Sequence, residues 1–178
     1  STMELKNHWT GQNAKVHGQN QYKFKRDITQ PLLNFGRCIV HFAVDTDEVY
    51  MTTKLNGPGT FFLPFNLGNN FGKGNPINPN GHKTAYLWEE VWERESWLEI
   101  LGRYLIAQRD KKKLIFPRYH QLDVTRKLQA AVLKQGAAGK YLVQHSAGSG
   151  KTTSIAWTAH FLAELHDASN RKVFDSVL

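Results

Sequence analysis

The chain has 178 residues, a formal net charge of +8 and one cysteine, Cys38. This length suits one domain or two small ones. No apolar run approaches the roughly 20 residues that a membrane span needs, and the first residues do not resemble a signal peptide. The lone cysteine excludes a disulfide framework within the chain, so we expect a buried, reduced thiol and a cytoplasmic protein. The positive charge indicates a polyanionic partner, nucleic acid first, although a basic protein with a solvated surface shows the same excess.

The first part of the chain predicts short elements of mainly β type. They are a strand over 3–6, a helix beginning within 17–26, two strands at 37–44 and 49–55 joined as a hairpin by an acidic connection, and a further short strand at 61–65. Residues 66–82 are rich in Gly, Asn and Pro and predict a long loop. A loop of this length in a compact domain is usually functional or mobile, so it could contact DNA or a neighbouring domain, or be a plain surface loop.

Thr84 is the expected cap of a helix that starts near residue 85 and continues towards Leu105 at helical spacing. We interpret its three tryptophans as core residues, with a base-stacking platform as the alternative; they are Trp88, Trp92 and Trp97. The charge-rich segment 109–113 predicts a boundary between domains 1–108 and 109–178.

The second domain is expected to alternate helices and strands. The pattern predicts a helix over 118–134 that ends at the glycines of 136–139, a buried strand over 140–144, a helix over 152–165 and the beginning of a strand within 171–178.

A phosphate-binding loop, Ser146–Thr152, lies between the predicted strand and helix. Gly148, Ser149 and Gly150 let backbone N–H groups surround a phosphate, and the helix N-terminus favours an anion. Lys151 would reach the β- and γ-phosphates of ATP, and Thr152 would supply a hydroxyl to Mg²⁺. The common pattern has Gly or Ala where this chain has His145.

Gln121 lies about thirty residues before the loop, in the run Phe116-Pro117-Arg118-Tyr119-His120-Gln121. A glutamine amide both donates and accepts, so it can bond two edges of adenine while a nearby aromatic ring stacks on the base. A glutamine on a helix surface is the alternative interpretation.

Glu4-Leu5-Lys6 would place Glu4 and Lys6 on one face of the first strand, with Leu5 towards the core. This spacing suits a metal-dependent nuclease in which Glu4 binds Mg²⁺ and Lys6 orients the attacking water. An exposed strand edge carries the same tripeptide often.

Several stretches, in this order, resemble the restriction-and-translocation subunit of type I restriction-modification enzymes. They are 3–7 with 10–12, 19–22, 35–37 through the hairpin, 64–66 with the following loop, 84–90, 116–121 and 145–152. That subunit has a PD-(D/E)xK nuclease domain followed by a superfamily 2 helicase-like motor. The resemblance implies an α/β chain, with the C-terminal half of the nuclease fold and then the start of a RecA-like, doubly wound parallel-sheet motor lobe.

The resemblance also assigns roles to residues. Glu4 and Lys6 become nuclease residues, Gln19 and Tyr22 take the places of a supporting Gln and Tyr although only two residues separate them, and Gln121 and Lys151 become motor residues. ATP and Mg²⁺ are the implied cofactors. The implied partners are duplex DNA and the modification and specificity subunits, with no membrane, and the implied activity is ATP-dependent cutting of unmodified DNA away from the recognition site.

We expect the chain to be a fragment, because both ends resemble strand interiors. It contains neither the acidic metal ligand that precedes Glu4 in such nucleases nor the motor's Asp-Glu motif, so we expect the 178 residues alone neither to cut DNA nor to hydrolyse ATP. Two alternatives remain: a helicase-like ATPase with a non-cutting, DNA-binding N-terminal module, and a non-enzymatic remnant.

Overall fold

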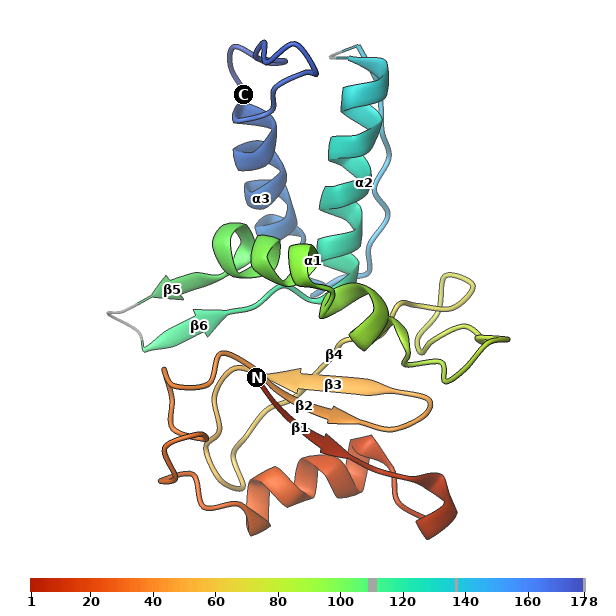
Figure 1. Ribbon diagram of the computed structural model, residues 1–178, viewed down its shortest axis with the longest axis vertical. Coiled ribbons are helices and arrows are strands. Elements are labelled where there is room, and N and C mark those ends of the chain that lie inside the picture. Colours follow the sequence, from red (N-terminus) through yellow and green to blue (C-terminus); the bar gives the residue numbers. More distant parts are fainter. Residues whose placement is uncertain (109–111, 137, 178) are drawn as a thin grey trace. The chain divides into compact units, whose positions relative to one another are not determined.

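The computed structural model describes residues 1–108, 112–136 and 138–177 (Figure 1). The chain divides into two compact units, Ser1–Arg118 and Tyr119–Leu178. The predicted boundary after residue 108 adjoins 109–111, which lie outside the described residues. In the described parts of the chain, no helix is long and apolar enough to cross a bilayer.

The first unit is built on a four-stranded mixed sheet. In spatial order its strands are β1 (Thr2–Leu5), β2 (His41–Val44), β3 (Val49–Thr52) and β4 (Leu63–Pro64). β1 runs parallel to β2, with Glu4 opposite Ala43, and the other neighbours are antiparallel. The first predicted strand is therefore present with its predicted length, displaced by one residue. The hairpin and the short strand at 61–65 are also present, and their strands are shorter than predicted.

Helical turns connect β1 to β2 and cover one face of the sheet. They are η1 (His8–Thr10) and two wide π-type turns, η2 (Ala14–Gly18) and η3 (Gln21–Lys25). Gly18 permits the close approach, because a Cβ at this position would lie only 3.0 Å from the Cβ of Ala43. Ala14, Tyr22 and Phe62 belong to the buried cluster on this side.

Aromatic side chains fill the opposite face of the sheet. The ring of Phe42 lies 5.5–6.2 Å from the rings of Phe65, Trp92 and Phe116. Trp97 extends this cluster through Trp92 and Phe116, which confirms the core interpretation for these two tryptophans. Trp88 is more exposed.

The segment after the long loop contains η4 (Leu87–Val91), α1 (Arg94–Glu99) and η5 (Ile100–Tyr104). Thr84 does not cap it with its side chain, because its hydroxyl donates to the carbonyl of Asp45 at 2.7 Å. A hairpin that the sequence did not predict follows, formed by β5 (Ile106–Gln108) and β6 (Lys113–Ile115). Cys38 is buried as expected, with its thiol directed at the carbonyl of Val40.

The second unit contains two packed helices, α2 (Tyr119–Gln135) and α3 (Lys151–Ala163), close to their predicted bounds. The predicted strand over 140–144 is wrong: this segment is exposed and forms no strand. The strand predicted within 171–178 is also wrong for the described residues, where Lys172 forms one isolated bridge with His166. A strand needs a neighbour to bond its backbone, and the described residues of this unit supply no second strand. The structure is mixed α/β, and residues 119–136 and 138–177 do not form the predicted parallel sheet.

Candidate functional site

The predicted nuclease pair lies at the edge of the first unit's sheet. Glu4 is buried at 8% exposure beneath the helical turns, whereas Leu5 is 64% exposed, so the expected inward direction of Leu5 is wrong. The Glu4 carboxylate accepts from Arg26, whose Nε lies at 2.6 Å and Nη2 at 2.5 Å from Oε1. The structure thus buries the acidic member of the pair and neutralises it with a guanidinium that the sequence did not indicate.

Lys6 lies on the same face as Glu4, close to Gly18, and its ammonium donates to the side-chain carbonyl of Gln21. Gln19 instead ends η2, where its backbone N–H bonds the carbonyls of Ala14 and Val16. The structure therefore brings Gln21, rather than Gln19, to Lys6. The wide turns of η2 and η3 explain the difference, because they move side chains off the face that ordinary helical spacing predicts.

Tyr22 is buried away from this lysine. Its hydroxyl lies 2.8 Å from Oγ1 of Thr2, and the same Oγ1 lies 2.7 Å from Nδ1 of His41. Burial raises the pKa of Tyr22 well above its ordinary value, with Thr2 opposing the shift in part. Burial, together with the ammonium of the N-terminus, lowers the pKa of His41 to about 4. Both groups are neutral at pH 7, and they support the core.

A second cluster, which the sequence analysis missed, joins His8 to the hairpin turn. Nε2 of His8 lies 3.6 Å from Asp45 and 3.2 Å from Asp47, and one ligand atom from each of the three residues falls within 4.8 Å of the others. The Asp45 carboxylate already accepts the backbone N–H groups of Ala14, Asp47 and Glu48. Lys83 bonds Asp47 at 2.6 Å and is the main cause that lowers the pKa of this aspartate. These bonds make the cluster a turn-stabilising network.

The phosphate loop has the backbone that its glycines predict. Gly148 and Gly150 have φ angles of +70° and +84°, which residues with a Cβ rarely adopt, and α3 begins directly afterwards at Lys151. A Cβ on Gly150 would also lie 2.6 Å from Nε2 of Gln121. The loop therefore needs a glycine at this position for two independent reasons.

Two consecutive residues of α2 form side-chain hydrogen bonds with two consecutive backbone carbonyls of the loop. Nε2 of His120 lies 2.9 Å from the carbonyl oxygen of Ser149, and Nε2 of Gln121 donates to the carbonyl of Gly150 at 3.0 Å. In a planar trans peptide the N–H points opposite to the C=O. The amides of Gly150 and Lys151 are therefore turned away from the α2 side chains that bond these carbonyls. Gln121 was predicted to sense adenine; here its amide supports the loop, and its contact with a base stays a prediction.

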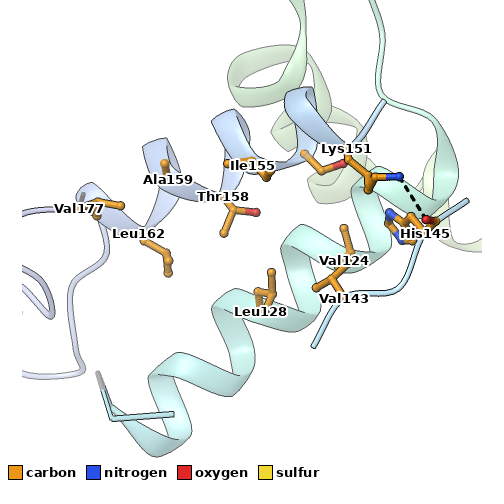
Figure 2. A pocket seen from close by; sticks show the side chains of 11 residues that line it. Val124, Leu128, Val143, His145, Lys151, Ile155, Thr158, Ala159, Leu162 and Val177 are labelled. Atoms are coloured by element: carbon orange, nitrogen blue, oxygen red, sulfur yellow. Dashed lines mark hydrogen bonds between the residues drawn. The ribbon is translucent and has the colours of Figure 1, made fainter. Parts of the chain in front are cut away.

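The ammonium of Lys151 bends back onto its own loop. It donates to the carbonyls of His145 at 3.2 Å and Ser146 at 2.9 Å, as Figure 2 shows for His145. These neutral acceptors can be exchanged for phosphate oxygens, which bond an ammonium more strongly. Thr152 is exposed in the first turn of α3. Turned amides, a lysine and an adjacent hydroxyl fit the triphosphate of ATP with Mg²⁺.

An apolar cavity of about 320 Å³ lies beside the loop, between α2 and α3 (Figure 2). Leu128 of α2 faces Ile155 and Leu162 of α3 across the cavity. Val143, from the segment 140–144 that forms no strand, also borders it. Lys151 and Ser154 also line the cavity.

No protein-family model matches the chain, and neither a curated protein nor a solved structure matches it.

Proposed function

We propose that this chain joins the nuclease and motor parts of an ATP-dependent DNA translocase and endonuclease, of the kind found in the restriction subunit of type I restriction-modification enzymes. The observation that carries the proposal is the presence of two chemically different groups of residues in two separate compact units. In the first unit, Glu4 and Lys6 lie on one face of the sheet edge, and Gln21 of η3 accepts from Lys6. In the second unit, Lys151 begins the helix after a glycine loop.

In the motor unit, the chain's own residues bind and orient the triphosphate. His120 and Gln121 hold the loop carbonyls, so that the amides of Gly150 and Lys151 are available to phosphate oxygens. Lys151 exchanges its carbonyl partners for the β- and γ-phosphates, and Thr152 offers its hydroxyl to Mg²⁺. The magnesium ion neutralises phosphate charge when it is bound.

In the nuclease unit, Glu4 supplies one carboxylate ligand to a divalent cation, and Lys6 holds the attacking water. Gln21 fixes the direction of Lys6 through its side-chain carbonyl. Because Mg²⁺ keeps several waters and is commonly held by one or two carboxylates plus substrate phosphates, water and a DNA phosphate would complete the shell around Glu4. Duplex DNA is the substrate, and the modification and specificity subunits are the proposed partners.

A helicase-like ATPase with a non-cutting N-terminal module is the second candidate. The close pairing of Glu4 with Arg26 favours it, because a carboxylate that accepts from a guanidinium is less available to a cation.

The test uses the complete subunit assembled with its partners. Lys6→Ala should abolish cutting and leave ATP hydrolysis intact, whereas Lys151→Ala should abolish hydrolysis and translocation. Lys15→Ala, at an exposed lysine of η2, serves as the matched control for Lys6. Normal cutting by the Lys6→Ala enzyme would favour the second candidate, and loss of ATP hydrolysis in that enzyme would contradict the division into two sites.

A further inference from the structure

The loop after β4, coloured yellow to yellow-green in Figure 1, contains a tight reversal at Asn69–Gly72. The backbone N–H of Asn69 donates to the carbonyl of Gly72 at 3.1 Å, and the N–H of Gly72 donates to the carbonyl of Asn69 at 2.7 Å. The two central residues, Asn70 and Phe71, have φ angles of +45° and +62°. Such turns favour Asn-Gly, because a Cβ is disfavoured in the left-handed region, and a bulky ring at this position is therefore an outlier.

The loop is held firmly at its base. Asn75 is buried, and its side chain accepts from the N–H of Leu67 at 2.8 Å and donates to the carbonyl of Asp47 at 2.8 Å. A third bond joins Gly68 to Gly74, from N–H to carbonyl, at 2.9 Å. These bonds fix the backbone on both sides of the turn that carries Phe71.

Phe71 is fully exposed. It therefore adds no buried apolar area to its own unit, while its backbone conformation costs stability. Phe71 therefore weakens the fold of its own unit. A partner molecule that covers the ring would explain why a phenylalanine stands at this position.

The surrounding composition indicates the chemistry of that molecule. The loop over 66–82 contains no Asp or Glu, and Lys73 follows the turn directly. The carboxylate of Asp47, near the base of the loop, is paired with Lys83 at 2.6 Å. Phe71 is the only apolar side chain in Gly68–Gly74. A protein interface generally has a contiguous apolar centre, whereas a single ring beside a lysine suits insertion between stacked bases with contact to a phosphate.

We propose that Phe71 is an aromatic wedge that inserts between neighbouring base pairs of duplex DNA while Lys73 contacts the backbone phosphate. The inference rests on the proposed function only in taking duplex DNA as the partner. It adds a contact residue and a mode of deformation that the nuclease and ATP sites do not require.

The test measures binding of the 178-residue chain to a short duplex carrying 2-aminopurine, whose fluorescence rises when its neighbours unstack. Phe71→Gly should weaken binding about 10-fold and abolish the rise, in line with the value of aromatic–base stacking. The same variant should raise Tm, because glycine accepts the positive φ. Lys73→Ala should lower the salt slope by about one while keeping part of the fluorescence rise.

Ile77→Ala is the matched control, since Ile77 lies in the same loop at 82% exposure, and it should bind as the unmodified chain does. Unchanged affinity and fluorescence in Phe71→Gly would overturn the proposal, as would an equal loss in Ile77→Ala or a lower Tm in Phe71→Gly. Failure of the unmodified chain to bind duplex DNA would overturn it too, while ATP binding through Lys151 would be unaffected. Weaker association with a partner subunit, with DNA binding unchanged, would assign Phe71 to a protein interface instead.

Discussion

The two units hold their candidate residues in different ways. In Ser1–Arg118, Glu4 belongs to a paired strand, and burial beneath helical turns fixes its surroundings. In Tyr119–Leu178, the phosphate loop is held by two side-chain bonds from α2 to backbone carbonyls, and Lys151 remains exposed. The first arrangement depends on the whole sheet and its core, whereas the second depends on a few local contacts. Core substitutions should therefore act mainly on the stability of the first unit, and loop substitutions mainly on ligand affinity in the second.

The largest expected effect comes from the aromatic core of the first unit. Phe42→Ala removes a fully buried ring that contacts Phe65, Trp92 and Phe116, and it should cost about 3–5 kcal/mol of unfolding free energy. Urea denaturation followed by tryptophan fluorescence measures the change. Phe61→Ala, at an exposed position of the same unit, should change the value by less than about 0.5 kcal/mol. Similar losses in both variants would show that the core assignment is wrong.

The second effect concerns pH and His41. Because the folded-state pKa of about 4 lies below the ordinary value of 6.5, the unfolded chain binds the proton first as pH falls. Stability should therefore be complete above about pH 6.5 and decline towards pH 4, by at most about 3 kcal/mol from this residue. Denaturation of the unmodified chain and of His41→Gln across this range isolates the contribution. An equally steep decline in the variant would exclude His41 as its cause.

A smaller effect is expected at the loop. Gly150→Ala places a Cβ in the space of the Gln121 amide and strains a φ of +84°, so it should weaken nucleotide binding about 10-fold without unfolding the first unit. Titration with a fluorescent ATP analogue measures the affinity. Gly102→Ala has open space around its Cβ and should leave the affinity unchanged. Unchanged affinity in Gly150→Ala would mean that the loop tolerates a different backbone from the one described.

The features that could be predicted from the sequence are those decided by neighbouring residues. Period-two alternation placed Glu4 and Lys6 together, and glycine spacing predicted the turn before α3. The direction of Leu5 could not be predicted, because it depends on which face the residues around Tyr22 cover. Gln21 was missed since wide π-type turns change the helical spacing. The segment 140–144 has strand-forming residues, but a strand also requires a neighbouring backbone, which local sequence does not specify.

Calorimetric titration of the 178-residue chain with Mg²⁺-ATP measures whether the loop from Ser146 to Thr152 binds the phosphates of ATP, as we propose. The unmodified chain should bind, and Lys151→Ala should weaken binding about 10- to 100-fold, because a charged hydrogen-bond donor to phosphate is lost. Lys140→Ala, at an exposed lysine of the same unit, should bind normally. Equal affinity in the Lys151 and Lys140 variants, or no binding by the unmodified chain, would show that this loop does not bind ATP through Lys151.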